Sequence, residues 1–324
     1  MPKALWYVEP GIAVLRDEQV APGPDDLCVR AHFGAISRGT EALVFAGRVP
    51  QTEYQRMRGP HMGGVFPFPV KYGYAIVGTV YSGPPHLHGR MGFALHPHQD
   101  LFALPPDGFI PLPEGVPPQR AVLAANMETA LNAVWDGAPG PADRIAVIGA
   151  GVVGALVAFL CAQVPGADVV LVDIDPARTA LARALGVTFA SLGGAPKDCD
   201  LVFHASGSAS GLATAFDLAG DEARIIEMSW YGAGETAIPL GGAFHSRRLT
   251  IASSQVGKVA PSHRPRWTPA RRMAAALGLL RDARLDALIA PPIRFADLPA
   301  ELPRILAPSS GVLCQRIDYP AAAS

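Results

Sequence analysis

The chain has 324 residues, of which 49% are hydrophobic and 17% are charged, and its formal net charge at pH 7 is −1. This length suffices for about two domains. A charge so close to zero gives no general attraction to nucleic acid or to an anionic membrane surface, so neither is expected as a partner.

The N-terminal third has the pattern of a β-rich region. Residues 27–33 alternate apolar and polar side chains with period two, and so do residues 76–81, which predicts a strand in each segment. Turn sequences interrupt them, such as Ala-Pro-Gly-Pro-Asp at 21–25 and Ser-Gly-Pro-Pro at 82–85. Residues 1–118 are therefore expected to form short strands joined by many loops.

The sequence pattern changes at Gln119. A helix is predicted over 119–135, ended by the Gly and Pro residues of 136–141. Strands and helices then alternate, which predicts a parallel sheet covered by helices on both faces. The expected strands are 144–148, 169–173, 187–190, 200–204, 223–228 and 249–253, with helices at 176–185 and 269–280. From Leu285 the chain returns to short strands and prolines.

The simplest topology is an α/β protein with two domains. A β-rich domain is built from both ends of the chain, residues 1–120 and 282–324, and a doubly wound Rossmann domain of residues 121–281 is inserted between them. The active site is expected in the cleft between the domains, facing the carboxyl ends of the parallel strands.

A glycine motif follows the strand at 144–148. Gly149 allows a sharp turn, Gly151 leaves room for a pyrophosphate, and Gly154 lets the following helix approach the sheet. The amides near Val152 and Val153, at the helix start, can receive phosphate charge. Glycines also occur in ordinary turns, but here the strand before the motif and the helix after it both favour dinucleotide binding.

An acidic residue at the end of the next strand supports the same interpretation. Asp173 lies nineteen residues after Gly154 and can accept hydrogen bonds from the adenosine ribose hydroxyls. Its charge would repel the 2′-phosphate of NADP, so NAD is the expected cofactor, although Arg178 is close enough in sequence to soften that argument. Ser206, just beyond the strand at 200–204, is also assigned to the cofactor site.

Two features bear on location. Residues 145–167 carry no charged side chain and are long enough to span a membrane, but their glycines and Pro165 favour a buried strand followed by a buried helix. The first residues have no signal-peptide core, so a cytoplasmic protein is expected.

The cysteines form no CxxC motif, which excludes the common local zinc and redox signatures and favours reduced thiols. They are Cys28, Cys161, Cys199 and Cys314.

Nearly the whole chain resembles the medium-chain dehydrogenase/reductase superfamily, which includes zinc alcohol, sorbitol and threonine dehydrogenases and zinc-free quinone reductases. Four segments carry the resemblance: Ala35–Glu41, Tyr72–Gly78, Gly89–Phe93 and Glu128–Val134. The resemblance implies a GroES-like β-rich catalytic domain, a Rossmann domain, nicotinamide-dependent hydride transfer and a homodimer.

Departures from the family pattern concern the metal. Ser37 stands near the position of the first zinc-binding cysteine, Tyr74 replaces the histidine and Ala75 replaces the glutamate. Serine and tyrosine hydroxyls are poor zinc ligands. The lobe with four cysteines is absent, because only Cys28 precedes residue 161. The resemblance therefore points to a zinc-independent member. Bacteriochlorophyllide a dehydrogenase is similar in its Gly-Thr-Glu segment and in this tyrosine.

Without zinc, a hydrogen-bond donor must polarise the substrate. Tyr74 is the first candidate, because the resemblance implies a place for it beside the nicotinamide; the alternative is a packed core tyrosine. Ser37, Thr40 and Glu41 are further catalytic candidates on what is expected to be one polar loop, where turn chemistry is the alternative.

Candidate substrate-binding residues are Arg38, His96 and Arg248. His96 and His98 are two residues apart, an incomplete metal site, and are expected at the surface or lining the substrate site. Arg248 belongs to a stretch, residues 236–281, that has eight basic and no acidic residues. This stretch could capture an anionic substrate, or it could be a solvated face balanced elsewhere. Glu128 could face the cleft or be a salt-bridged helix acid.

The sequence thus predicts a zinc-independent oxidoreductase that transfers a hydride between NAD(H) and a small polar or anionic hydroxy or keto compound. One alternative is an NADPH-dependent quinone or enone reductase, and another is a non-catalytic NAD(H)-binding sensor or scaffold. A homodimer is expected through the apolar edge strand at 249–254.

Overall fold

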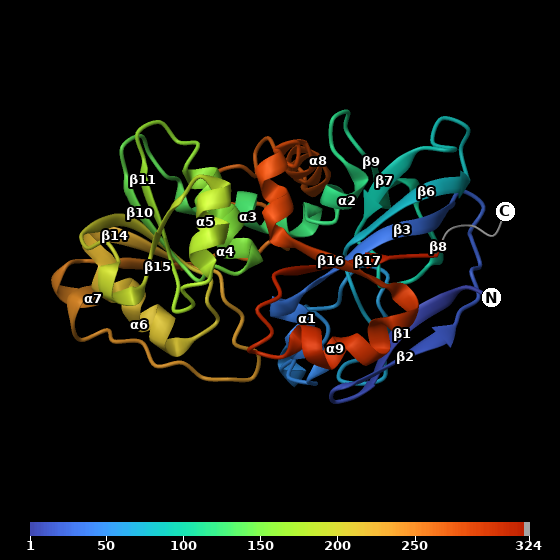
Figure 1. Cartoon of the computed structure of the whole chain (residues 1–324), viewed down its shortest axis with the longest axis horizontal. Helices are drawn as coiled ribbons and strands as arrows, with labels where there is room; N and C mark the ends of the chain where they lie inside the picture. Colours follow the sequence, from blue (N-terminus) through green and yellow to red (C-terminus); the bar gives the residue numbers. More distant parts are fainter. Residues whose placement is uncertain (321–324) are drawn as a thin grey trace. The chain divides into compact units, whose positions relative to one another are not determined.

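The computed structural model describes residues 1–320, and residues 321–324 of the expected β-rich domain lie outside the described part. The chain forms two compact units (Figure 1). The first contains Met1–Ala125 and the segment from Leu277 onward, and the second contains Asn126–Ala276. The second unit begins and ends slightly inside the expected 121–281 domain.

The first unit is mainly β-structure from both ends of the chain. Its elements are β1 (Lys3–Glu9), β2 (Ile12–Asp17), β3 (Leu27–Ser37), α1 (Arg38–Phe45), β4 (Gly63–Gly64), β5 (Val70–Lys71), β6 (Ile76–Ser82), β7 (Met91–Ala94), β8 (Leu101–Leu104), β9 (Phe109–Pro111), α2 (Pro118–Ala121), β16 (Ile289–Arg294), α9 (Leu298–Leu306) and β17 (Cys314–Asp318).

Two sheets organise this unit. The larger has the strand order β16-β17-β3-β6-β7-β9, with β8 pairing to β3, and the smaller has the order β2-β1-β5-β4. The C-terminal strand β17 pairs antiparallel with β3 and parallel with β16, so the last part of the chain completes a sheet begun near its start. Period-two apolar side chains such as Leu27 and Val29 are fully buried, as the alternating pattern predicts.

The second unit contains an alternating series of strands and helices. Its elements are α3 (Ala124–Gly137), β10 (Arg144–Ile148), α4 (Val152–Cys161), β11 (Asp168–Val172), α5 (Arg178–Leu185), β12 (Thr188–Ala190), β13 (Cys199–His204), α6 (Ala209–Leu218), β14 (Ala219–Glu227), α7 (Ala243–Ser246), β15 (Thr250–Ser253) and α8 (Pro269–Leu279). Helices α3 and α8 each cross the boundary between the units.

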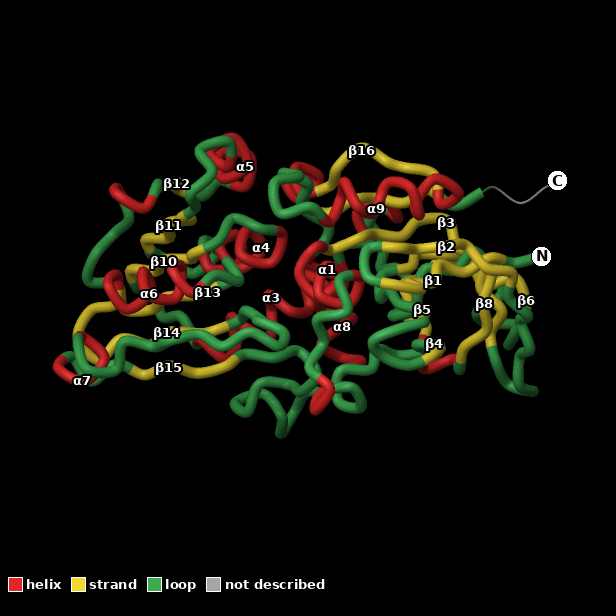
Figure 2. The backbone as a smooth tube through the Cα atoms, turned by 90° about the horizontal axis from the view of Figure 1, so that it is seen from below, coloured by secondary structure: helices red, strands yellow, loops and turns green. Residues whose placement is uncertain are grey.

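The second unit has one parallel sheet with the order β12-β11-β10-β13-β14-β15, and Figure 2 shows these strands side by side. All the pairings in it are parallel. The strand order reverses direction between β10 and β13, which is the switch point where doubly wound sheets bind dinucleotides. The predicted fold class, a Rossmann sheet joined to a β-rich unit, is confirmed.

The uncharged segment 145–167 folds as most of β10 and the whole of α4, so its interpretation as a buried strand and helix is confirmed. Within residues 1–320, no helix combines the length and apolarity needed to cross a membrane.

Three local predictions were wrong. The helix expected over 119–135 is divided into α2 and α3 at Val122 and Leu123, where the Leu123 N–H bonds to the Arg120 carbonyl at 3.0 Å, a tighter turn than that of an α-helix. The polar loop at Ser37–Glu41 is instead the end of β3 and the first turn of α1. The C-terminal segment, expected to hold only strands, contains helix α9.

Candidate functional site

The turn between β10 and α4 has the shape that the glycine motif requires. Gly149 has φ +103°, and the Ser206 backbone nitrogen lies 2.7 Å from the position that a Cβ on Gly149 would occupy. A Cβ on Gly154 would overlap the carbonyl oxygen of Gly149. Gly149 therefore permits the contact with the next strand, and Gly154 permits the helix to approach the turn.

Gly151 keeps the entrance to this turn open. It is the N-cap of α4, and apart from the adjoining backbone no described atom lies within 4 Å of the position that its Cβ would occupy. The first helical hydrogen bond runs from Ala155 to the Gly151 carbonyl at 2.9 Å, so the amides of Val152 and Val153 precede it. A glycine at the open face of a helix start provides the space and the N–H groups that a pyrophosphate needs.

Asp173 is joined directly to the glycine turn. Its Oδ2 accepts the N–H of Ala150 at 2.6 Å, and its Oδ1 accepts the N–H of Asp175 at 2.8 Å. Each carboxylate oxygen has two lone pairs, so each can still accept a ribose hydroxyl. The structure thus gives Asp173 a second role, holding the turn in shape, which the sequence did not indicate.

Two neighbours of Asp173 bear on the cofactor. Arg178, the residue that could have attracted a 2′-phosphate, has its Nε 3.4 Å from Asp175 Oδ2, and its side chain is only 16% exposed. Ile174 is 80% exposed although it is a large apolar residue. This exposed apolar side chain next to the acid is a candidate contact for the adenine ring of a dinucleotide. Sequence analysis missed Ile174, although an isoleucine between two aspartates was a visible signal.

A hydrogen-bonded group that includes Ser206 lies beyond β13. The Oγ of Ser206 is 2.6 Å from His204 Nε2, and His204 Nδ1 is 2.7 Å from Glu227 Oε2. Ser206 is exposed, whereas His204 is fully buried at the end of its strand. Sequence analysis predicted Ser206 but missed its two partners. The signal for them was a histidine and a glutamate, each ending an apolar strand.

The polar candidates of the first unit surround the buried carboxylate of Glu41. Its Oε1 accepts the N–H of Ser37 at 3.3 Å, while its Oε2 accepts the Tyr7 hydroxyl at 3.0 Å and lies 3.1 Å from His98 Nε2. Burial raises the pKa of Tyr7 well above its usual range, and the Glu41 charge adds to this. Because Glu41 is fully buried, it cannot contact a substrate, and its assignment as a catalytic residue is corrected to a positioning role for Ser37 and α1.

Tyr74 is brought next to Ser37. Its hydroxyl lies 3.4 Å from the Ser37 carbonyl oxygen, a long bond that another acceptor can replace. Burial, followed by the charge of Glu41, raises the pKa of Tyr74 well above its usual range. The phenol therefore keeps its proton at physiological pH and acts as a hydrogen-bond donor. Thr40, half-buried on α1, lies on the same helix as Glu41.

Arg38 does not have the role predicted from the sequence. Its guanidinium donates to the carbonyl oxygens of Val312 at 3.3 Å, Ala307 at 2.9 Å and Pro308 at 3.0 Å. These bonds fasten α1 to the segment after α9. The donors that would bind an anionic substrate are thus used within the fold, and we correct the substrate-binding assignment of Arg38.

The two histidines are buried rather than at the surface. The ring of His96 stacks on Phe102 with centroids 3.9 Å apart, and its Nδ1 is 2.9 Å from the Pro97 carbonyl oxygen. Burial lowers the pKa of His96 to about 3, so it is neutral at physiological pH. His98 faces Glu41 instead. The expectation of surface histidines is therefore wrong, and His96, 4% exposed, has little contact with a substrate.

Arg248 lies at the wrong edge of the parallel sheet to meet the cofactor. It precedes β15, whereas the glycine turn follows β10, so the two occupy opposite edges. Its Nε is 3.5 Å from Glu222, and its side chain is 80% exposed. We therefore withdraw it from the substrate site. Arg247 and Arg272 of the basic stretch also form ion pairs, with Asp221 and Glu128, so these two charges are balanced within the fold.

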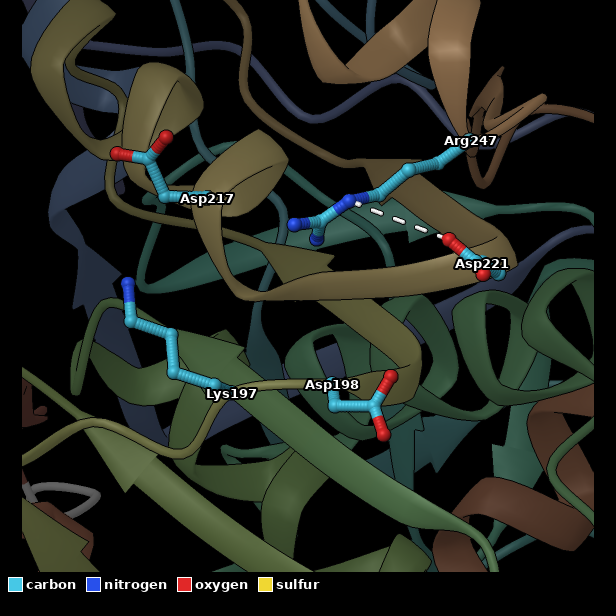
Figure 3. Close-up of a pocket in the computed structure, with 5 residues that line it drawn as sticks. All are labelled: Lys197, Asp198, Asp217, Asp221 and Arg247. Atoms are coloured by element: carbon cyan, nitrogen blue, oxygen red, sulfur yellow. Dashed lines mark ion pairs between the residues drawn. The ribbon is translucent and has the colours of Figure 1, made fainter.

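Arg247 lines a pocket of about 410 Å³ at the same amino edge of the sheet (Figure 3). Its Nε lies 4.0 Å from Asp221 Oδ1, and its Nη1 donates to the Ala219 carbonyl at 2.8 Å. The lining is charged in both signs: Lys197, Asp198, Asp217, Asp221 and Arg247. This pocket is separate from the cofactor turn.

Glu128 is the salt-bridged helix acid that the sequence left as an alternative. Its Oε1 is 3.0 Å from Arg272 Nε, and both side chains are buried. Burial raises the pKa of Glu128, and the Arg272 charge opposes that shift. Arg272 also donates to Asn132 at 2.5 Å and to the Val256 carbonyl at 2.5 Å, which ties α8 and the loop after β15 to α3.

The side chains at the positions of the family's catalytic zinc do not fit a metal. Ser37 and Tyr74 offer neutral hydroxyls, and Ala75 offers no donor. Among residues 1–320, no group of three or more His, Cys, Asp or Glu side chains is arranged to hold an ion.

Comparisons with known proteins agree with this geometry. The family model of the 3-hydroxyacyl-CoA dehydrogenase NAD-binding domain matches residues 144–193, which contain the glycine turn and Asp173. No curated protein matches the chain in sequence.

Solved structures match over nearly the full length. L-idonate 5-dehydrogenase from Escherichia coli K-12 has a TM-score of 0.80 and 12% identity, covering 98% of each chain. Alcohol dehydrogenase TADH from Thermus sp. ATN1 has a TM-score of 0.74 and 18% identity, covering 98% of this chain and 100% of that one. TarJ from S. aureus, in complex with NADPH, has a TM-score of 0.76 and 14% identity, covering 99% of each.

These likenesses establish the fold. The chain has the two-domain fold of the medium-chain dehydrogenases/reductases, as the sequence resemblance predicts. The family model that matches residues 144–193 is the NAD-binding domain of a dehydrogenase.

Proposed function

We propose that this protein is a zinc-independent oxidoreductase that transfers a hydride between NAD(H) and a small polar hydroxy or keto compound. The observation that carries the proposal is the turn after β10. Gly151 leaves the helix start open, and Asp173 is fixed beside it by its bond to Ala150. Bound there, NAD would supply the hydride chemistry.

The preference for NAD over NADP rests on charge. Asp173 places a carboxylate at the end of β11, where a 2′-phosphate would be repelled. Arg178, the nearest basic side chain in sequence, is paired with Asp175. Ile174 provides an apolar face for adenine, which both cofactors share. The rival NADPH-dependent reductase gains support from the NADPH bound to TarJ.

Tyr74 is proposed to polarise the substrate oxygen. Its raised pKa keeps the phenol protonated, so it can donate a hydrogen bond to a carbonyl that gains negative charge, but it is a poor base. The bond to Ser37 is long enough to be exchanged for one to the substrate. Glu41 holds the Ser37 backbone N–H through its Oε1, which fixes the strand end next to Tyr74.

The substrate is proposed to be a polar hydroxy or keto compound. The name L-idonate 5-dehydrogenase, carried by a protein of the same fold, supports a hydroxy acid as one possibility. The arginines of this chain give no added support for an anionic substrate, because Arg38 and Arg248 are bonded elsewhere.

The test is a turnover assay of the purified protein with NAD and NADP over polar alcohols, and with NADH and NADPH over their ketones. We expect turnover with NAD(H) that persists in a chelator, and no zinc by elemental analysis. About one zinc per chain would overturn the zinc-independent proposal. Tight NADH binding with no turnover on any compound would instead support the alternative of a non-catalytic NAD(H) sensor.

A further inference from the structure

The loop between β15 and α8, together with the first turn of α8, carries exposed cations that no acid balances. We call them the basic patch, and they are Lys258, Arg264, Arg266 and Arg271. Within residues 1–320, none of these side chains forms an ion pair, and the ion pairs of this stretch are made by Arg247, Arg248 and Arg272. The whole chain has a formal net charge of −1, so the patch differs in charge from the rest of the molecule.

The acids on the helices that support the loop are bonded elsewhere. Helix α3 holds the loop, because Asn132 Oδ1 accepts a backbone N–H of the loop at 3.0 Å. The two acids of α3 are Glu128, which is buried and paired with Arg272, and Asp136, which accepts from Ser254 at 2.7 Å and from Asn132 at 3.0 Å. Helix α8 has no acidic residue. The patch therefore has no counter-charge on either helix.

Carbonyl oxygens and an aromatic ring, rather than acids, hold two of the guanidinium groups in place. Arg264 Nε donates to the Val259 carbonyl at 2.8 Å, and Arg271 Nη1 donates to the Arg266 carbonyl at 2.7 Å. The Arg271 guanidinium also lies over the Trp267 ring, 4.0 Å from its centroid. These contacts fix both groups without neutralising them, so their other N–H groups can donate to carboxylates at a small cost in conformational entropy.

Aromatic side chains fix the shape of the loop. The Trp135 ring of α3 stacks on His263, with centroids 4.1 Å apart and planes at 6°, and it contacts Trp267 at 4.8 Å. Trp267 in turn packs against Arg271. Because these ring faces are used within the fold, the patch offers charge rather than a surface on which nucleic acid bases can stack.

The place of Arg271 on its helix also favours an anion. Helix α8 begins at Pro269, and its first turn contains Arg271 and Arg272 but no acid. A helix N-terminus carries a partial positive charge, which repels cations and attracts anions. Arg272 is buried and neutralised by Glu128, whereas Arg271 is exposed. An anion bound at Arg271 would therefore be stabilised by the guanidinium and by the helix end together.

We propose that the basic patch docks an acidic segment of a partner protein, in which several Asp or Glu residues lie in a short run. Carboxylates along an extended chain can each meet one of the four cations. A short run matches the small extent of the patch, whereas a nucleic acid would extend beyond it over a molecule of net negative charge. Exposed charge pairs are individually weak and are screened by salt, so the docking depends on several pairs and on ionic strength.

The test measures the binding of fluorescein-labelled octaglutamate to the purified protein by fluorescence anisotropy. We expect saturable binding at about 50 mM salt that weakens by about tenfold or more at about 300 mM. Octaglutamine, which has the same length without the charge, should not bind. Absence of octaglutamate binding at the lower salt, or equal binding of octaglutamine, would overturn the proposal. Equal or tighter binding of a single-stranded DNA octamer would overturn the assignment to an acidic protein.

A triple variant locates the binding. Arg264→Gln, Arg266→Gln and Arg271→Gln together should weaken octaglutamate binding by about tenfold or more, because each exposed charge pair contributes up to about fivefold. If circular dichroism shows that this variant does not fold, Arg266→Gln alone replaces it, since the Arg266 guanidinium is exposed and has no hydrogen-bond or ion-pair partner within residues 1–320. The single variant should weaken binding by about two- to fivefold. Unchanged binding in a folded variant would overturn the proposal.

The matched control separates the patch from the overall charge. Arg56→Gln, Arg90→Gln and Arg183→Gln together remove three exposed arginines from other parts of the chain and change the net charge by the same amount. This control should bind octaglutamate like the wild type. Equal weakening in both triple variants would show that net charge, rather than the basic patch, attracts the peptide, and would overturn the inference.

Discussion

Asp173 combines two functions in one carboxylate, since it holds the turn at Ala150 and presents its charge at the end of β11. We expect Asp173→Ala to weaken NADH binding by about tenfold or more, because hydrogen bonds to charged groups are worth about 1.5–3 kcal/mol. This substitution should also reduce the difference in affinity between NADH and NADPH. Asp173→Asn is the control: it keeps an acceptor for Ala150 and should mainly improve NADPH. Fluorescence titration with both cofactors checks this, and tighter NADPH binding by the wild type would contradict it.

Tyr74 is the residue on which the proposed chemistry depends. Tyr74→Phe removes the hydroxyl but keeps the ring, so turnover should fall by about 10²–10⁴-fold while NADH affinity stays unchanged. The control is Tyr72→Phe, at the buried tyrosine two positions earlier. Its turnover should stay within roughly a few-fold of the wild-type value, because Tyr72 is not proposed to donate to the substrate. Full turnover in Tyr74→Phe would reduce Tyr74 to core packing and leave Ser37 and Thr40 to be tested.

His96 should make the stability of the fold depend on pH. Its pKa in the folded protein, lowered to about 3 by burial, lies below the unfolded value of about 6.5. The unfolded chain therefore binds this proton first. The contribution is complete above about pH 6.5 and is lost as pH falls toward 3, by up to about 1.4 kcal/mol per pH unit. Urea unfolding between pH 7.5 and 4.5 measures the slope.

The variant His96→Asn should flatten the dependence of the free energy of unfolding on pH, even if the substitution lowers stability at neutral pH. His86→Asn, at an exposed position of the same unit, should leave the slope unchanged. Equal slopes in wild type and His96→Asn would show that other groups control acid unfolding.

At the scale of residues, the sequence predicted what local spacing determines. The glycine turn and Asp173 are fixed by neighbours along the chain, and the structure shows the expected turn. Glu41 and Arg38 were assigned wrongly because they bond to partners distant in sequence, such as Tyr7 and Ala307, and His96 was assigned wrongly because its burial was not foreseen. The Arg38 guanidinium donates to the Ala307 carbonyl, and the His96 ring stacks on Phe102. A polar side chain shows its chemistry in the sequence, but burial decides whether a ligand can reach it.

At the scale of elements, prolines account for the largest omission. Helix α9 has buried apolar residues at 298, 302, 305 and 306, which is a helical spacing. Pro299 and Pro303 made the segment look like loop and strand. Proline in the first turn of a helix loses no hydrogen bond, so Pro299 is compatible with the helix. The break between α2 and α3 has no proline or glycine to mark it in the sequence.

The junction of α3, α8 and the loop after β15 depends on Arg272. We expect Arg272→Ala to lower the free energy of unfolding by about 3–5 kcal/mol, because it leaves Glu128 buried without its partner. Arg272→Met with Glu128→Gln removes both charges and should recover part of that loss. Urea unfolding measures the free energy of unfolding of both variants. Equal decreases in this free energy would show that the carbonyl contacts of Arg272, rather than the ion pair, hold the junction.

In the molecule as a whole, the order of elements was predictable because it follows from the alternation of strands and helices and from the glycine motif. Alternating strands and helices require a parallel sheet, and the glycine turn marks its first strand. A β-rich unit built from both chain ends was expected from their sequence pattern, whereas the pairing of β17 with β3 was not predicted. The contact between His204 and Glu227 was not predicted, because only folding brings together these two residues, which are 23 positions apart.

The open edge of the parallel sheet offers a surface for association with a second copy of the chain. β15 is the terminal strand of its sheet, and its Ile251 and Ala252 are half-buried in the single chain. The N–H of Ser254 bonds to Glu227 on β14 at 2.9 Å. Amide direction alternates along a strand, so the N–H groups of Ile251 and Ser253 point away from β14 and are available to a second copy.

We therefore propose a homodimer in which β15 pairs with its counterpart in the partner. Light scattering at micromolar concentration should give twice the mass of the chain. Ser253→Pro removes an outward N–H and should give monomers, because proline cannot donate to a strand ladder. Ser253→Ala keeps the N–H and should remain dimeric, which separates the loss of the ladder from the loss of the hydroxyl. A monomeric wild type would refute the dimer, and a dimeric Ser253→Pro would place the interface on another surface.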